Sequence, residues 1–458
     1  MFSYFNEKSL ITGLAVLLAA CGPDTQPAAP EDAESVDVQS QDLSEELDRQ
    51  DALEEVSSLT DLTTAELDVG EVIQSTEGYL VPTYVRPGTS FFDSPWPSDL
   101  RRTQGGNPEL SDFPRASSGL VHTYVNYFER DVTGFSTMPV VYVSFSHDIS
   151  DIPLPTPAET LLEDSPIQLI RIDSDHCGET VAVEVVARAG GSRFIPAPIL
   201  AASPVHGLVL EPATSYALII KRTFGLGSHI GQNEDQGGLL GTYSPAGYRD
   251  DLSSGRLETL STCLTELGLA EDVAVATSFT TQDPIQELEQ LVAFATSDSV
   301  SLSDALNWAI DQDYTVQDSY TTWTGDLPMP IFQAGDSPYN SQGGFRYDSD
   351  DNPILQRWEN APIILTVPDG PGPFPVLIWA SGAGHRLRGH VRQPLFQALL
   401  DSGIAIAKFV PQFEDERTVP GADLDLHTYN YLNPESARAV LRQQVIESAY
   451  FVRWVTNA

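Results

Sequence analysis

Short apolar and β-branched runs, separated by turn residues, dominate the chain between Tyr79 and Asp283. Each run is bounded by Pro, Gly, Asp or Ser, which is typical of antiparallel strands joined by short turns. The runs that predict strands are Val140–Phe145, Ile167–Ile172, Val181–Val186, Tyr216–Ile220 and Ala276–Gln282. Short strands at such regular spacing predict an immunoglobulin-like β-sandwich over residues 79–283.

Three other segments have the apolar spacing of helices. They are Ser254–Leu267, Pro284–Ala295 and Ser303–Ile310. Because two of them follow the predicted sandwich directly, we interpret residues 284–360 as a helical linker followed by a β excursion.

A polar stretch in that segment has some of the ligands of a calcium-binding loop. Asp348, Asp350 and Asn352 alternate, and Glu359 takes the twelfth position. Pro353, however, stands where such a loop needs a glycine with positive φ, and no helix pattern flanks the stretch. A hairpin turn is therefore favoured, and we predict no metal site.

The pattern changes again over residues 361–458. The predicted strands are Ile363–Pro368, Val376–Ala380 and Ile404–Val410, and the predicted helices are Gln393–Ser402 and Glu435–Val455. The second strand is an unbroken apolar run, of the kind that is buried on both faces of a sheet. Strands that alternate with helices are typical of α/β folds. The chain as a whole is thus predicted to be an α+β multidomain protein.

Composition and charge exclude some classes of function. The 458 residues carry 65 acidic and 24 basic side chains, a formal net charge of −41. Nucleic-acid-binding proteins recognise phosphates with basic patches, so we exclude a nucleic-acid partner. A polybasic protein of the membrane surface is excluded for the same reason.

The N-terminal residues 1–21 resemble a lipoprotein signal peptide. Lys8 precedes an apolar run that is too short to cross a bilayer, for which about 20 apolar residues are needed. Leu18-Ala19-Ala20-Cys21 is similar to the bacterial lipobox, in which the cysteine becomes the first residue and carries lipid. We therefore predict lipid attachment at Cys21, a membrane partner, and a location in the bacterial cell envelope, at the outer membrane or cell surface. The alternative is an ordinary secretory signal in which Cys21 occurs by chance.

Residues 22–78 have the composition of a solvated spacer. They contain seventeen acidic residues, one basic residue (Arg49) and no aromatic residue. Such a segment cannot bury enough apolar area to offset the entropy lost on ordering. We predict an acidic disordered tether between the anchor and the folded body.

Two cysteines remain once Cys21 is set aside, Cys177 and Cys263. An exported protein matures in an oxidising compartment, where such a pair can form a disulfide. Two separate buried thiols are the alternative, because nothing in the sequence brings the two Cα atoms together.

Several strings resemble those of a known enzyme family. PVLIWASGAGHR followed by LFQALLDSGIAIAKFVPQF is similar to the front half of an α/β-hydrolase, and Tyr429–Pro434 is similar to the segment before the nucleophile strand of bacterial exported lipase and lysophospholipase lipoproteins. The strings SPWPSDLRR, VSFSHDI, LVLEPATSYAL and SFTTQDP are similar to the N-terminal β domain of those proteins. The resemblance implies a carboxylic-ester hydrolase that acts on a lipid or another ester and needs no cofactor.

The resemblance also implies a place for the oxyanion hole. Gly382, Ala383 and Gly384 match the HGxG loop of the family, with Ser381 in place of its histidine. Backbone amides in such a loop stabilise the oxyanion of a tetrahedral intermediate. The alternative is an ordinary strand-to-helix connection. Ser381 itself lacks the strand, G-x-S-x-G and helix that surround a nucleophile in this fold.

The nucleophile motif itself is missing, since no G-x-S-x-G occurs in the chain. In this fold the nucleophile, the acid and the histidine follow one another in that order. We therefore expect all three beyond Ala458, and we interpret residues 361–458 as a partial hydrolase core that is inactive alone. The string VPQFEDER also departs from the family, which often has an Asp and a His-Gly pair there.

A second interpretation comes from a different functional class. It is a non-catalytic surface lipoprotein that binds a glycan or a protein through its β-sandwich and has a degenerate α/β part. A nucleophile motif encoded after residue 458 favours the enzyme, and a genuine stop codon there favours the binding protein.

Overall fold

The computed structural model describes residues 91–145, 148–196, 198–224, 253–380, 386–389, 391–419 and 421–457. All of them belong to one compact unit, Ser75–Ala458. The predicted signal peptide with Cys21, the predicted tether over 22–78 and the predicted oxyanion residues 382–384 lie outside the described residues.

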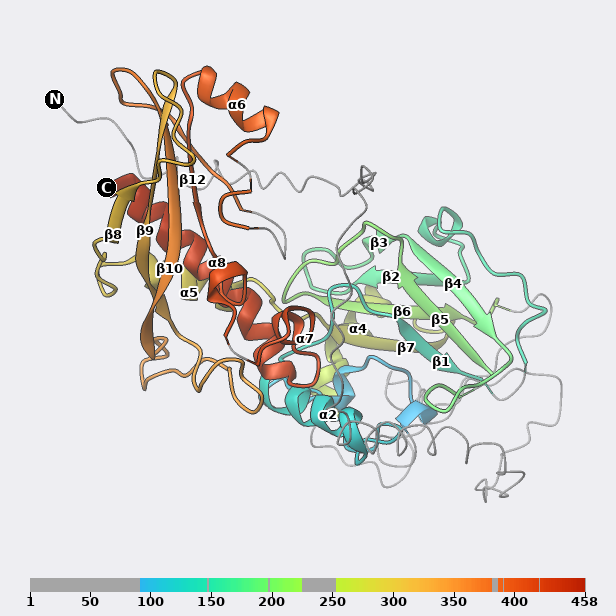
Figure 1. Cartoon of the computed structure of the whole chain (residues 1–458). Coiled ribbons are helices and arrows are strands. Elements are labelled where there is room, and N and C mark those ends of the chain that lie inside the picture. Colours follow the sequence, from blue (N-terminus) through green and yellow to red (C-terminus); the bar gives the residue numbers. More distant parts are fainter. Residues whose placement is uncertain are drawn as a thin grey trace, which may run out of the picture. The chain divides into compact units, whose positions relative to one another are not determined.

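Helices and three β-sheets make the described part of the chain an α+β protein (Figure 1). The helices are α2 (Gly119–Asp131), α4 (Ser253–Glu266), α5 (Gln286–Thr296), α6 (Pro394–Asp401), α7 (Leu424–Tyr429) and α8 (Pro434–Asn457). The strands are β1 (Val141–Ser144), β2 (Ile167–Arg171), β3 (Thr180–Val181), β4 (Val183–Arg188), β5 (Ile199–Pro204), β6 (Ser215–Lys221), β7 (Val273–Thr280), β8 (Leu306–Ile310), β9 (Tyr320–Ile331), β10 (Arg357–Pro368), β11 (Val376–Ile378) and β12 (Ala405–Phe409). None of the helices in these ranges combines the length and the apolarity needed to cross a bilayer.

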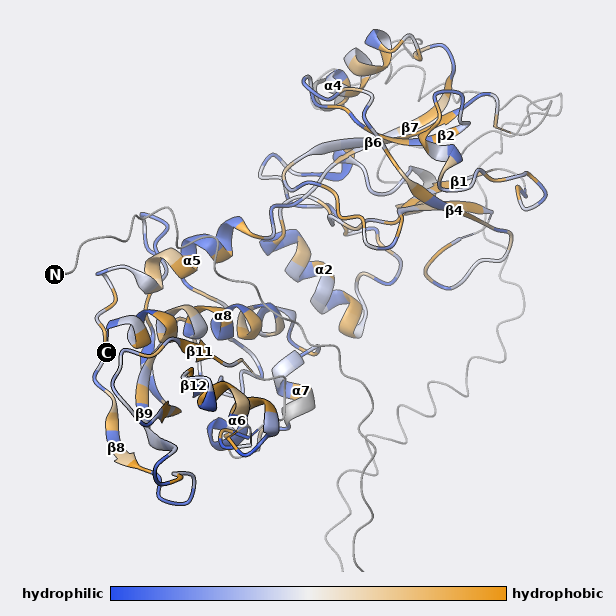
Figure 2. Cartoon of the chain, turned by 90° about the horizontal axis from the view of Figure 1, so that it is seen from above, coloured by the Kyte–Doolittle hydropathy of each residue, from blue (hydrophilic) through white to orange (hydrophobic). Residues whose placement is uncertain are grey.

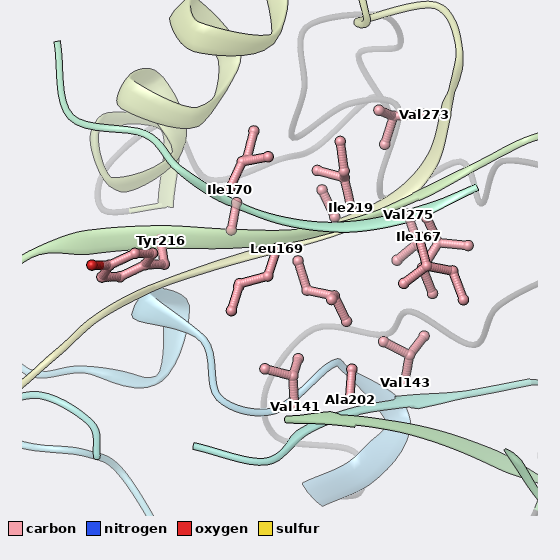
Figure 3. Close-up of a cluster of buried hydrophobic side chains, with 14 of the residues drawn as sticks. Val141, Val143, Ile167, Leu169, Ile170, Ala202, Tyr216, Ile219, Val273 and Val275 are labelled. Atoms are coloured by element: carbon pink, nitrogen blue, oxygen red, sulfur yellow. The ribbon is translucent and has the colours of Figure 1, made fainter. Parts of the chain in front are cut away.

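Two antiparallel sheets face each other across a shared apolar core. One sheet has the strand order β1-β5-β4, and the other has the order β3-β2-β6-β7. Figure 3 shows Val141, Val143 and Ala202 of the first sheet opposite Ile167 and Leu169 of the second. Four of the five predicted runs contain or overlap one strand each, whereas Val181–Val186 is divided between β3 and β4, which lie in different sheets, and β5 is not among the predicted runs.

The other face of the four-stranded sheet is covered by α4. Leu260 and Leu264 of α4 belong to the same apolar core, and Ile170 of β2 points away from the three-stranded sheet (Figure 3). Burial on both faces explains why β6 is buried without interruption from Tyr216 to Lys221.

A disulfide joins α4 to the connection between β2 and β3. Its cysteines are Cys177 and Cys263, whose Cα atoms lie 5.6 Å apart. Of the two possibilities that the sequence leaves open, the structure has the paired one. The bond links positions 86 residues apart and ties a surface connection to the helix that covers the sheet.

The third sheet has the strand order β11-β12-β10-β9-β8. β11 and β12 are parallel, and the other neighbouring pairs are antiparallel. β8 and β9 come from the segment predicted as a helical linker and β excursion, so this segment contributes two strands to the sheet.

Helices cover both faces of this sheet (Figure 2). Phe396 of α6 and Ile406 of β12 belong to the apolar cluster on one face. Tyr450 of α8 and Ala407 of β12 belong to the cluster on the opposite face, where α5 also packs against α8. Because Ile406 and Ala407 are consecutive, β12 serves both layers and all of its residues are buried.

Two sequence predictions are wrong in this part of the chain. Ser303–Ile310 contains the strand β8 instead of a helix, and Trp308 stacks on Trp323 of β9 with an angle of 8° between the rings. Pairing of β8 with β9 thus outweighs the helical spacing of the apolar residues.

The second wrong prediction concerns β11. Val376 of β11 is 41% exposed instead of buried, because β11 is an edge strand of the described sheet.

We predict that the double substitution Cys177→Ser and Cys263→Ser lowers the free energy of unfolding by about 4 kcal/mol, because the disulfide restricts the unfolded chain over a long loop. Urea unfolding followed by circular dichroism measures the loss. Reducing the wild-type protein should produce the same loss, whereas the double variant should not respond to the reductant. An unchanged unfolding midpoint in the double variant would contradict this prediction.

Candidate functional site

The ends of the two parallel strands mark the candidate site. Ligands of open α/β sheets bind beyond the carboxyl ends of the strands, where crossover connections leave in opposite directions. The predicted oxyanion residues Gly382, Ala383 and Gly384 follow β11 and lie outside the described residues. Their described neighbours are residues 386–389 and the segment 410–419 that follows β12.

A buried lysine fixes the chain just after the predicted oxyanion residues. Lys408 of β12 is 3% exposed, and its Nζ donates to the carbonyl oxygen of Arg386 at 2.8 Å. Burial lowers the pKa of Lys408, because an ammonium group loses hydration in the interior. Burying a cation costs free energy unless the cation is hydrogen-bonded. The bond to the Arg386 carbonyl therefore keeps residue 386 beside Lys408.

A second bond holds the same short segment. The carboxylate of Asp415 accepts a hydrogen bond from the backbone amide of Leu387 at 2.8 Å. Asp415 has a φ of 39°, and nearby Phe413 has a φ of 67°. Left-handed backbone at non-glycine residues costs energy and concentrates at functional sites. The chain after β12 is thus strained in the place where it holds the chain after β11.

Arg388 ties this segment to the end of β8. Its Nε donates to Asp311 at 2.9 Å, and one of its terminal nitrogens lies 3.5 Å from the carboxylate of Glu416. The hydrogen bond with Asp311 raises the pKa of Arg388. Burial, together with neighbouring Asp415, raises the pKa of Glu416. Charged side chains from three segments therefore meet around residues 386–389.

A buried ion pair connects the segment after β12 with α8. Arg417 binds both carboxylate oxygens of Glu447, at 2.7 and 2.9 Å, and the Glu447 side chain is fully buried. Arg417 also donates to Glu359 of β10 at 3.3 Å and to the carbonyl oxygen of Val410 at 2.9 Å. Burial works against the charge of Arg417, but Glu447 and Glu359 keep its pKa above the ordinary value. The pair therefore joins β10, the loop and α8.

A buried tyrosine completes this polar network. The hydroxyl of Tyr339 accepts hydrogen bonds from Arg357 at 2.6 Å and from Gln412 at 2.9 Å. Burial raises the pKa of Tyr339, so the phenol stays neutral at ordinary pH. The carbonyl oxygens of the Gln333 and Gln412 side chains are buried without a hydrogen-bond partner. Such unsatisfied buried acceptors are rare in native proteins.

These contacts hold residues 386–388 against β12 and the segment after it. Within the described ranges we find no nucleophile paired with a histidine base: His122 bonds to Ala116 and Asn126, and His427 bonds to the backbone of Asp423. The same residues contain no cluster of three His, Cys, Asp or Glu side chains suited to a metal ion. In the stretch that has some calcium-loop ligands, the carboxylate of Asp348 accepts hydrogen bonds from the backbone amides of Asp350 and Asn352, which closes a tight turn.

The sequence offers only a weak signal for the scaffold residues. Lys408 is a charged residue inside an apolar strand, in a chain with three lysines, and three consecutive acidic residues, 414–416, follow β12. Neither feature predicts the partner, because Arg386 and Glu447 lie far from Lys408 and Arg417 in the sequence.

Comparison with known proteins gives no match: no family model, no curated protein and no solved structure matches the chain.

We predict that Glu447→Gln lowers the free energy of unfolding by about 3–5 kcal/mol, because it leaves the Arg417 charge buried and poorly paired. A double variant, Arg417→Met with Glu447→Met, should recover a large part of this loss because no buried charge remains. Urea unfolding measures all three proteins.

The matched control is Asp298→Asn, which removes the exposed partner of Arg453. A surface pair contributes little, so this substitution should change stability by less than about 0.5 kcal/mol. Equal effects of Glu447→Gln and Asp298→Asn would show that the buried pair does not hold the loop to α8.

Proposed function

We propose that this chain is the front part of an exported, lipid-anchored carboxylic-ester hydrolase that acts on a lipid or another ester by serine acyl transfer. Residues 361–458 form the front half of an α/β-hydrolase core, preceded by an immunoglobulin-like β-sandwich. The serine, acid and histidine come from residues after Ala458, so the chain alone is inactive.

The observation that carries this proposal is the direction in which the chain crosses the third sheet. The connection from β11 to β12 passes over one face through α6, and α8 leaves β12 over the opposite face. Crossovers between parallel strands are almost always right-handed. The connection through α8 lies on the other face from α6. If it is also right-handed, it must run across the sheet in the opposite direction from the α6 connection, so that it passes β11. The next parallel strand is therefore expected to pair with the free edge of β11.

That strand would make β11 the switch point of a doubly wound sheet, which is where such sheets bind ligands. In the family that the sequence resembles, it is the strand that ends in the nucleophile elbow. The edge position of β11 and the 41% exposure of Val376 are compatible with a further strand on this side.

The oxyanion residues of this proposal are Gly382, Ala383 and Gly384. The hydroxyl oxygen of the serine attacks the ester carbonyl, and the backbone amides stabilise the negative charge on the tetrahedral intermediate. The alcohol leaves, and water then releases the acid from the acyl-enzyme. The contacts of Lys408 and Asp415 with Arg386 and Leu387 support a preorganised loop, because they fix the chain where it leaves these residues.

The exported location rests on the N-terminal residues. The similarity of residues 18–21 to a lipobox supports lipid attachment at Cys21, and the disulfide between Cys177 and Cys263 is compatible with an oxidising compartment. The acidic stretch 22–78 would hold the body away from the membrane surface.

We test the function with the protein extended to the natural end of its reading frame and with the 458-residue chain. The extended protein should hydrolyse p-nitrophenyl butyrate, and a fluorophosphonate probe should label one serine located after residue 458. The 458-residue chain should show neither reaction. A probe-labelled serine within residues 1–458 would contradict the assignment of the nucleophile, and an extended protein without turnover or labelling would contradict hydrolase function.

We also predict that Lys408→Met in the extended protein lowers kcat for p-nitrophenyl butyrate at least about tenfold, with a smaller effect on KM. The substitution removes the bond that holds the chain next to the proposed oxyanion residues. Those residues stabilise mainly the transition state, so kcat is affected more than KM. The matched control is Lys221→Met. Lys221 is also a buried lysine that donates to a backbone carbonyl, that of Glu163, but it lies in the β-sandwich. Equal losses of kcat in the two variants would contradict a positioning role for Lys408.

A further inference from the structure

An apolar groove runs between α2 and the N-terminal part of α8. Its volume is about 550 Å³, which lies in the range of binding pockets, roughly 300–1,000 Å³. One wall belongs to α2 and the other to α8, and Trp96 and Phe135 also line the groove.

Both walls present side chains at helical spacing. The lining residues lie three or four positions apart along each helix: Tyr124, Tyr127 and Phe128 of α2, and Ala437, Arg438 and Leu441 of α8. Residues with this spacing form a stripe on one side of a helix. Two such stripes side by side have the form of a groove that receives a third helix.

Two contacts hold α2 and α8 at a fixed spacing. The hydroxyl of Tyr124 donates to the carbonyl oxygen of Tyr431, just before α8, at 2.9 Å. Arg130 pairs with Glu435 in the first turn of α8 at 3.0 Å. The groove is therefore already formed without a partner, which lowers the entropic cost of binding.

The surface of the groove has the composition of an interface centre. Phe128, Tyr429 and Leu441 line it and are 38%, 55% and 49% exposed. Arg438 is the one charged side chain among the described residues of the lining. Interface centres are likewise rich in aromatic residues and arginine and poor in other charged residues. Exposed apolar surface of this kind marks an interaction site.

The charge of the surrounding chain selects the partner. Residues 79–458 carry 47 acidic and 22 basic side chains, a formal charge of −25, and none of the acidic ones lines the groove. The field of such a body attracts a cationic partner and repels an acidic one. A second copy of this chain is therefore disfavoured. The stretch 22–78, with seventeen acidic residues and one basic residue, is disfavoured for the same reason.

The walls also decide which form of partner fits. The backbone amides and carbonyls of α2 and α8 bond within each helix along its length, so the groove offers no row of free backbone groups to a strand. Binding must then come from apolar side chains that enter the groove. A helix supplies these on one face, at positions i, i+3, i+4 and i+7.

We propose that this groove binds an amphipathic helix of a cationic partner protein. The apolar face of that helix packs between α2 and α8, and its lysines and arginines lie along the acidic surface outside the groove. The attraction comes from the summed charge of the body and needs no unpaired carboxylate in the groove. This interaction goes beyond the proposed hydrolysis and does not depend on it.

A synthetic helical peptide of about 15 residues tests the proposal, with leucine on one face and lysine elsewhere. We measure its binding to the 458-residue protein by fluorescence anisotropy at physiological ionic strength and expect saturation at one site. Two control peptides should bind at least about tenfold more weakly. One has the same composition with the leucines spread around the helix, and the other has glutamate in place of lysine.

Each control separates one part of the proposal from the rest. No saturable binding of the leucine–lysine peptide would overturn it. Equal binding of the spread-leucine peptide would show attraction by charge alone, for example to the stretch 22–78, and would also overturn it. Equal or tighter binding of the glutamate peptide would overturn the cationic character of the partner.

Two substitutions locate the peptide on the protein. Phe128→Ser and Leu441→Ser each remove an exposed apolar side chain from one wall, so each should weaken binding at least about tenfold. The matched controls are Leu162→Ser and Leu395→Ser, because these leucines are 53% and 60% exposed and do not line the groove. Circular dichroism verifies that all four variants fold. Unchanged affinity in Phe128→Ser and Leu441→Ser, or equal losses in all four variants, would overturn the groove as the binding site.

Discussion

The buried ion pair between Arg417 and Glu447 is the contact on which the α/β half of the structure depends. It joins the loop after β12 to α8, and through Glu359 it also reaches β10. Gln443, one turn before Glu447, adds hydrogen bonds to the amide of Phe332 and the carbonyl of Pro330 at the end of β9. These buried polar contacts are satisfied in one register of the helix only.

Periodicity predicts the parts of this fold in which burial alone decides the structure. The strands of the sandwich, β12 and the long helix α8 follow the apolar pattern closely, because each is covered on one or both faces. β9 is not predictable in this way, since it contains Pro328 and Pro330. Its pairing with β10 along twelve residue pairs stabilises it instead. The helical spacing of Ser303–Ile310 is misleading for the same reason, because β8 in this segment pairs with β9 and Trp308 stacks on Trp323.

The candidate functional site is less predictable than the fold, because its contacts join residues that are far apart in the sequence. The glycine-containing segment at 382–384 can be found from its string, but the contacts of Lys408 and Asp415 with Arg386 and Leu387 cannot. The ion pair between Arg130 of α2 and Glu435 of α8 likewise joins two residues that no local pattern relates. Both regions use arginine and lysine, which are rare in this acidic chain. Because Lys and Arg are so few, a buried or paired one marks a contact that the fold depends on.

Residue-resolved amide hydrogen exchange on β11 tests the central claim most directly. The amide of Trp379 donates to Ala407 of β12 at 2.8 Å, so the preceding amide, that of Ile378, points toward the free edge. In the protein extended beyond Ala458, we predict that the Ile378 amide exchanges at least about 100-fold more slowly than in the 458-residue chain, because the next strand accepts its hydrogen bond. Equally fast exchange in both proteins would contradict a strand at this edge, and with it the hydrolase core proposed here.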